Sequence, residues 1–187
     1  MYFENENIKH IENSVFRKNV QLIFQDPYSS LNSEICIGDS IVEPMIVHRI
    51  FKTKKEIKLK ALSLLKQVGL KEKDFNKYPN QFSGGQRQRI VIARALALNP
   101  RIIVCDESVS ALDVSIQAEI LNLLNDLKEK FGFTYVFISH DMSVIKYFTD
   151  RVIVIKKGKI IELNETDSLF NFPKNKYTKE LLKASDF

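Results

Sequence analysis

The feature that most constrains the fold is an alternation, in the second half of the chain, of short apolar runs with a long amphipathic pattern. Residues 102–105 are continuously apolar, as in strands that are covered on both faces. Apolar residues then recur at helical spacing over 116–131, and Gly132 is placed to end that helix. A second apolar run covers 133–138. Strand, helix and strand in this order predict βαβ units and a parallel sheet.

Other segments carry weaker structural signals. Residues 19–24 form a β-prone run that stops before Pro27, and apolar residues at helical spacing over 57–68 predict an amphipathic helix ending at Gly69. Ser83 and Gln86 have the spacing of a capping box, so a helix is expected to start at Ser83. Residues 151–155 and 159–161 predict a hairpin, and the tail predicts a small helix with Thr178 as its cap.

The length of 187 residues fits one domain with a sizeable core. Residues 27–80 interrupt the strand–helix alternation and are interpreted as an inserted helical subdomain. Two cysteines are too few for a secreted disulfide framework, which indicates a reducing compartment. The polar start does not resemble a signal peptide, and no apolar run has the length of a membrane helix. The net charge of +5 is dispersed and does not identify a partner.

Three groups of residues are candidates for chemistry. Asp106 and Glu107 follow a predicted buried strand, where open α/β sheets bind ligands, and they suit a Mg²⁺ ligand and a base; a polar loop is the plainer interpretation. Ser83, Gly84, Gly85 and Gln86 join a hydroxyl to a helix N-terminus, which favours an anion, although glycines also occur at simple helix starts. His140 ends the second strand and is, taken alone, a loop residue.

The order and spacing of these groups resemble a known family. The segments that carry the resemblance are QFSGGQRQR at 81–89, IIVCDE at 102–107, SALD at 110–113 and ISHD at 138–141. They are similar to the signature motif, Walker B strand, D-loop and switch histidine of ATP-binding cassette (ABC) ATPases. The segment VQLIFQDPYSSLN at 20–32 resembles the family's Q-loop, with Gln25 as its glutamine. The residues of these segments are most similar to those of ATPase subunits of bacterial oligopeptide and dipeptide importers.

The resemblance implies an α/β fold, a P-loop NTPase-like parallel sheet flanked by helices, with ATP and Mg²⁺ as cofactors. It implies one nucleotide-binding domain over 1–187, with 27–80 as most of the helical subdomain and 164–187 as a C-terminal extension. The implied catalytic residues are Glu107 as base, His140 on the γ-phosphate and Gln25 sensing Mg²⁺ and water. Asp106 would coordinate Mg²⁺ with Gln25, Asp113 would bridge a dimer, and Ser83, Gly84, Gly85 and Gln86 would bind the partner's ATP.

The implied partners are membrane permease subunits, a sister ATPase in a head-to-tail dimer and, indirectly, a peptide-binding protein, with no nucleic acid. The implied location is cytoplasmic, peripheral on the inner face of the cell membrane. We also expect Glu107 and His140 to face one cleft, because both follow buried-type strands at their carboxyl ends.

The sequence departs from the family pattern in two ways. Ser108 stands where a proline usually follows the catalytic glutamate, a change that we expect to be tolerated. The glycine-rich loop ending Gly-Lys-Ser/Thr, which cradles phosphates, is not found. The first glycine is Gly38, already past the Q-loop, and Gly158-Lys159 is followed by Ile160. The chain is therefore expected to be N-terminally incomplete, lacking the Walker A region, and to be inactive alone.

Two alternatives to an importer ATPase stay open. The first is a non-catalytic module that lends its signature motif to an intact partner. The second is a soluble ABC ATPase of DNA repair, but such proteins tend to insert zinc modules or coiled coils between the Q-loop and the signature motif. That interval has no cysteine pair and no sustained heptads here.

Overall fold

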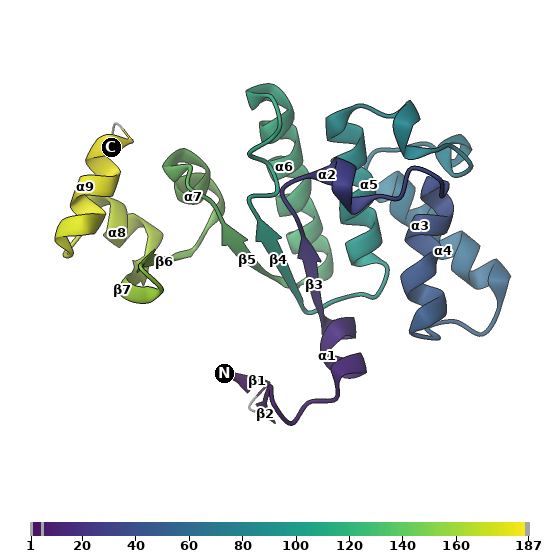
Figure 1. Cartoon of the computed structure of the whole chain (residues 1–187), viewed down its shortest axis with the longest axis horizontal. Coiled ribbons are helices and arrows are strands. Elements are labelled where there is room, and N and C mark those ends of the chain that lie inside the picture. Colours follow the sequence, from purple (N-terminus) through teal and green to yellow (C-terminus); the bar gives the residue numbers. More distant parts are fainter. Residues whose placement is uncertain (1, 5, 186–187) are drawn as a thin grey trace. The chain divides into compact units, whose positions relative to one another are not determined.

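The computed structural model describes residues 2–4 and 6–185 (Figure 1). The chain divides into two compact units between Val136 and Phe137. The first unit holds most of the sheet that the sequence predicts, and the second begins within the last strand of that sheet and holds a hairpin with short helices. Among the described helices, none has both the length and the apolar content needed to cross a bilayer.

This sheet has the strand order β3-β4-β5, with β3 at Val20–Ile23, β4 at Ile102–Asp106 and β5 at Thr134–Ile138. Strands β3 and β4 are parallel, in a register that runs from Val20 opposite Ile102 to Ile23 opposite Cys105. The long helix α6 (Val114–Phe131) connects β4 to β5. This arrangement confirms the predicted α/β fold and its parallel sheet.

Two helices pack in the first unit and follow their sequence signals. Helix α5 (Gly84–Leu96) contacts β3 and α6, and buries apolar residues including Ile90 and Ile92. Helix α6 ends at Gly132, whose φ of +69° lies in the left-handed region that glycine adopts without a steric penalty. Both predicted helix boundaries, the start at Ser83 and the stop at Gly132, are confirmed.

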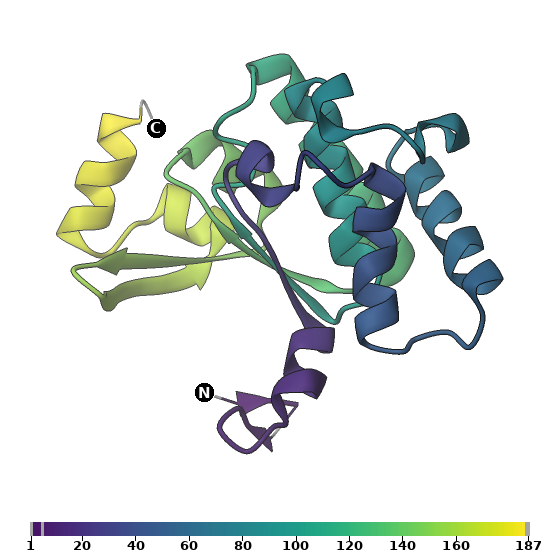
Figure 2. The same ribbon diagram turned by 45° about the vertical axis from the view of Figure 1, so that its right-hand side comes forward.

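Residues 27–80 contain helices and no strand. These are α2 (Pro27–Ser30), α3 (Ile37–Val47), α4 (Lys54–Gln67) and the 3₁₀ turns η1 (Glu72–Asp74) and η2 (Pro79–Gln81). The prediction that this segment does not continue the sheet is confirmed. Helix α4 begins one turn before the predicted stripe because Thr53 and Glu56 form a capping box. Helices α3 and α4 contact one another and lie side by side, away from the strands (Figure 2).

The first unit also contains a short N-terminal portion that no sequence pattern indicates. Strands β1 (Tyr2–Phe3) and β2 (Glu6–Asn7) pair antiparallel, and α1 (Asn13–Asn19) leads into β3. An ion pair joins Glu4 to Arg101, next to the start of β4. Strand β3 therefore begins at Val20, because Asn19 is the last residue of α1.

The second unit contains α7 (Met142–Phe148), β6 (Arg151–Lys156), β7 (Lys159–Glu165), α8 (Thr166–Asn171) and α9 (Lys176–Ala184). Strands β6 and β7 form the predicted hairpin, whose turn residues Lys157 and Gly158 both have positive φ. Met142, Val154, Leu169 and Leu182 form its core. Thr178 is not the cap of the last helix. Asn175 caps it by accepting from the Tyr177 N–H at 2.8 Å, and Thr178 lies fully buried within it.

Candidate functional site

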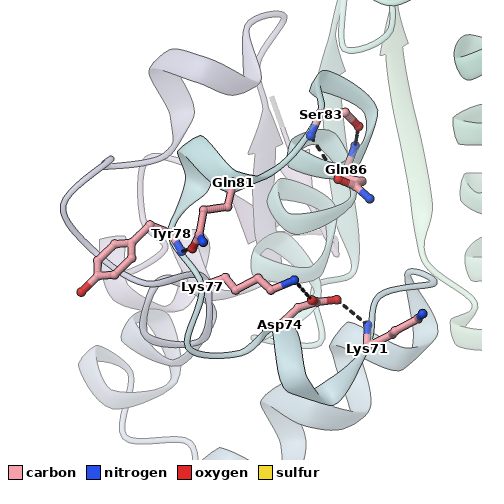
Figure 3. Close-up of polar contacts among 7 residues, drawn as sticks. All are labelled: Lys71, Asp74, Lys77, Tyr78, Gln81, Ser83 and Gln86. Carbon is pink, nitrogen blue, oxygen red and sulfur yellow. Dashed lines mark hydrogen bonds and ion pairs between the residues drawn. The ribbon is translucent and has the colours of Figure 1, made fainter.

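The glycine-containing start of α5 is closed by a reciprocal cap. The Ser83 N–H donates to Gln86 Oε1 at 3.1 Å, and the Gln86 N–H donates to Ser83 Oγ at 3.4 Å (Figure 3). Both side chains are exposed, while Gly84 and Gly85 are half-buried. The first-turn N–H groups of a helix lack intrahelical acceptors, and the helix dipole adds positive potential there. The start of α5 is thus capped and its cap residues are exposed, and anion binding by this element stays a prediction.

Ser110, which has no role predicted from the sequence, connects Gln25 to Glu107. Gln25 Nε2 donates to Ser110 Oγ at 3.1 Å, although these residues are far apart in sequence. The Ser110 N–H and its hydroxyl both donate to the Glu107 carbonyl, at 3.0 and 2.9 Å. Ser110 therefore links the Q-loop segment to the turn that carries Glu107. The SALD segment gives no local signal for this contact, which requires the neighbouring strands to be assembled.

The two carboxylates at the end of β4 have different environments. Asp106 is the last residue of the strand and is exposed, whereas Glu107 is half-buried and has a φ of +48°. A non-glycine residue in the left-handed region costs of the order of 1–3 kcal/mol and persists only where its surroundings hold it. The backbone of Glu107 is therefore fixed by its neighbours.

The donors at this edge fit a Mg²⁺ ion that is only partly held by protein. Magnesium commonly takes one or two carboxylates and completes its shell with phosphate oxygens and waters. Asp106 supplies an exposed carboxylate, and the Gln25 amide, with its nitrogen on Ser110, leaves its oxygen as an acceptor. No cluster of three or more His, Cys, Asp or Glu residues with metal-binding geometry occurs among 2–4 and 6–185. Asp106 and Gln25 thus offer two of the oxygen ligands that such an ion takes.

Helix α5 also holds the turn that follows Gln25. Asp26 caps α2 by accepting from the N–H groups of Tyr28 and Ser29, at 2.8 and 3.3 Å. Arg94 donates to the Ser30 carbonyl at 2.8 Å, and burial lowers the pKa of its guanidinium. The Arg87 guanidinium lies 4.0 Å from the centre of the Tyr28 ring. The seven-residue spacing of these arginines places them on one helix face, but it does not identify what they contact.

The remaining predicted site residues occupy separate places. Asp113 is exposed and precedes α6, and its side chain makes no capping hydrogen bond. His140 is exposed and belongs to the second unit, beside Asp141, which caps α7 by accepting from the N–H groups of Ser143 and Val144. That His140 shares a cleft with Glu107 stays a prediction.

The Gly-Lys pair has no P-loop geometry, because Gly158 lies in the β6–β7 turn and Lys159 begins a strand instead of a helix.

The chain is similar in sequence to ATP-binding proteins of transport systems. The chain is 50% identical over 169 residues to the oligopeptide transport ATP-binding protein OppF of Bacillus subtilis, covering 90% of the chain and 55% of OppF. It is 47% identical to OppF of Streptococcus mutans, covering 97% of the chain and 60% of that protein. The glutathione import ATP-binding protein GsiA of Escherichia coli O157:H7 is 51% identical, over 90% of the chain and 27% of GsiA. The chain thus spans little more than half the length of either OppF.

Two solved structures share the fold. The ATP-binding cassette MJ0796, in a dimeric post-hydrolysis state bound to ADP and Pi, superposes with a TM-score of 0.73 at 33% identity, over 88% of this chain and 72% of that chain. CbiO1 of Clostridium perfringens, part of the ABC transporter complex CbiONQ, gives a TM-score of 0.80 at 25% identity, over 91% and 67%. The family model described as ABC transporter matches residues 1–110. Because this family model matches more than half of the chain, the chain belongs to the ABC transporter family.

Proposed function

We propose that the chain is part of the ATP-binding and ATP-hydrolysing subunit of a bacterial importer for oligopeptides or dipeptides. The observation that carries the proposal is the hydrogen-bonded connection from Gln25 through Ser110 to Glu107, beside the exposed carboxylate of Asp106. It assembles a polar amide, a fixed candidate base and a metal ligand at one sheet edge. The similarity to OppF and GsiA supports peptides as the transported class.

Each residue then has a chemical role. Asp106 and the Gln25 oxygen hold Mg²⁺, which neutralises charge on the phosphates when it is bound. Glu107 accepts a proton from the attacking water, and His140 donates a hydrogen bond to the γ-phosphate. Ser83, Gly84, Gly85 and Gln86 present a hydroxyl, N–H groups and an amide to the nucleotide of a neighbouring subunit, and Asp113 bridges the two subunits.

The partners follow from the same assignment. A sister ATPase pairs head to tail with this chain; MJ0796 is a dimer with ADP and Pi. Residues 27–80 dock on membrane permease subunits, and a peptide-binding protein delivers the solute to them. The chain is then peripheral on the cytoplasmic face of the membrane. One domain over 1–187, with 164–187 as a C-terminal extension, is part of this proposal.

A second candidate function is favoured by one observation. The 187 residues contain no phosphate loop, yet the start of α5 is capped and exposed. A chain of this kind can act as a non-catalytic module, in which Ser83 to Gln86 complete the ATP site of an intact sister subunit. Glu107 would then have no substrate and no catalytic role.

One experiment tests the proposal and separates the two candidates. The P-loop region of OppF is joined to the chain, and the chimera is assembled with the permease subunits and an intact sister subunit whose own catalytic glutamate has been replaced. We expect ATP hydrolysis that Glu107→Gln abolishes while ATP binding is retained, because the amide keeps the shape and loses the base. Hydrolysis that is unaffected by Glu107→Gln would refute the catalytic role, and rescue of an unmodified sister by the chain without a P-loop would favour the second function.

A further inference from the structure

Helix α5 reaches the Glu107 turn through a buried amide. Gln88 lies one turn after Gly84 and is 1% exposed. Its Nε2 donates to the carbonyl of Ser108 at 2.7 Å. Gln88 Oε1 is buried and has no hydrogen-bond partner among the described residues. A half-satisfied buried amide costs free energy that an apolar side chain of similar size would not, so its single bond needs an explanation beyond packing.

The carbonyl that receives this bond belongs to the residue directly after Glu107. Ser108 is itself 1% exposed, and Glu107 holds its left-handed backbone conformation. On the other side of the turn, Ser110 donates twice to the Glu107 carbonyl. Two successive carbonyls therefore accept hydrogen bonds from different donors. The Glu107 carbonyl accepts from Ser110 within the turn, and the Ser108 carbonyl accepts from Gln88 on helix α5. The Gln88 bond is the buried one of the two.

We propose that Gln88 is a positioning residue that fixes the Glu107 turn to helix α5 and so connects two ATP sites. The inference rests on the proposed function. In a head-to-tail dimer the start of α5 serves the sister's nucleotide, whereas Asp106 and Glu107 serve the chain's own. Gln88 lies on the same helix as Ser83 to Gln86 and bonds the turn of Glu107, so a shift of α5 at one site moves the base of the other.

The link requires a donor at position 88, which a packing role does not. Methionine matches the length of glutamine and is apolar, so Gln88→Met keeps the volume and removes the bond to Ser108. Leucine is also apolar and is close to glutamine in volume, so Gln88→Leu, which likewise removes the donor, serves if the methionine variant fails to fold. The matched control is Gln67→Met on α4, because the Gln67 amide donates to Ser63 Oγ at 3.3 Å and the Gln67 oxygen is likewise buried without a partner among the described residues.

Hydrogen–deuterium exchange of the full chain at micromolar concentration measures the link directly. The Ser110 and Leu112 N–H groups, which bond to the carbonyls of Glu107 and Val109, report on the turn. We expect Gln88→Met to accelerate exchange in a peptide over 106–112 at least fivefold. The exchange rates of peptides from α3 and α4 should stay within twofold of those in the unmodified chain. Gln67→Met leaves 106–112 unchanged. Unchanged exchange in 106–112, or an equal acceleration everywhere, overturns the proposal.

The OppF chimera adds a catalytic readout. Gln88→Met is expected to lower kcat at least tenfold and to leave KM for ATP within twofold, because the base is misplaced while the nucleotide contacts remain. Equal changes in kcat and KM would assign Gln88 a general structural role and contradict the link between the sites. If the chimera itself does not hydrolyse ATP, the proposed function fails, and the exchange measurement still decides whether Gln88 holds the turn.

Discussion

Gly85 is the residue at which side-chain size matters most at the start of α5. A Cβ at this position would lie 2.5 Å from Cγ2 of Ile116, closer than packed carbon atoms approach. Overpacking costs about 1–3 kcal/mol, which exceeds the gain of up to about 1 kcal/mol in helix propensity. We therefore expect Gly85→Ala to lower the free energy of unfolding by about 1–2 kcal/mol, measured by urea denaturation.

Gly84 provides the control for this prediction. A Cβ at Gly84 would meet Leu112 at 3.7 Å and the Tyr28 hydroxyl at 3.8 Å, which are ordinary contacts. Gly84→Ala is expected to stay within about 0.5 kcal/mol of the unmodified chain. Removing Cγ2 by Ile116→Ala should make Gly85→Ala less costly than it is alone, since the two sites are in contact. Equal stabilities of the two alanine variants would show that Gly85 has room.

The sequence allowed some site residues to be predicted and not others. The motif residues Gln25, Ser83 and Glu107 were identified because their order resembles a family pattern. Ser110 and Gln88 were missed because each bonds a segment distant in sequence, Gln25 and Ser108 respectively. Such contacts depend on how β3, β4 and α5 pack together, and no local periodicity encodes them.

Among the elements, the short turn η1 is held by a charged side chain. Asp74 is buried and accepts from the Lys71 N–H at 3.0 Å, and its carboxylate pairs with Lys77 Nζ at 2.7 Å (Figure 3). The bond from Lys77 is the main cause that holds the pKa of Asp74 below its ordinary value, against the effect of burial. The ionised form therefore stabilises residues 71–77.

This pairing predicts a pH dependence of stability. Because the folded-state pKa of Asp74 lies below the unfolded value near 3.9, the stabilisation is present above that pH and is lost as pH falls through the folded pKa. Asp74→Asn is expected to lower the free energy of unfolding by about 1 kcal/mol at pH 7 and by less at pH 3. Urea denaturation at both pH values measures this. The exposed Asp126 on α6 is the control, with Asp126→Asn changing stability by less than about 0.5 kcal/mol. If Asp74→Asn lowered the free energy of unfolding equally at both pH values, the result would contradict the role of the Asp74 charge.

Element boundaries were predicted best where a local capping rule applies. Ser83 with Gln86 and Gly132 satisfy such rules, and both boundaries are confirmed. Thr178 was a wrong choice because Asn175 offers its side-chain oxygen one position before the helix, while Thr178 is drawn into the interior of the unit. The strands β1 and β2 have two residues each, too few for an alternating pattern to be recognised.

For the molecule as a whole, the two faces of the β3–β4–β5 sheet differ in burial. Ile23, Ile103 and Cys105 are fully buried, whereas Leu22 and Val136 are 43% and 46% exposed. Parallel sheets are usually covered on both faces, and an exposed apolar surface promotes association. We expect Leu22→Thr with Val136→Thr to reduce light scattering by the purified chain without loss of structure. Ile103→Thr, on the covered face, should unfold it; if the paired change leaves scattering as it was, this face is not the source of association.

Catalysis by these 187 residues alone depends on what can hold a triphosphate. A phosphate loop contributes backbone N–H groups and a lysine to the β- and γ-phosphates, and the chain contains no such loop. Its only Gly-Lys pair lies at the β6–β7 hairpin, where Lys159 begins a strand. Asp106 and Glu107 then have no positioned triphosphate, and positioning accounts for a large part of rate enhancement in this chemistry. We expect no phosphate release and no micromolar Mg-ATP binding by the purified chain, measured by calorimetry and a phosphate assay. The OppF chimera, which differs only in carrying the loop, is the control and should bind. Micromolar binding with turnover by the chain itself would mean that other residues in it form a phosphate cradle.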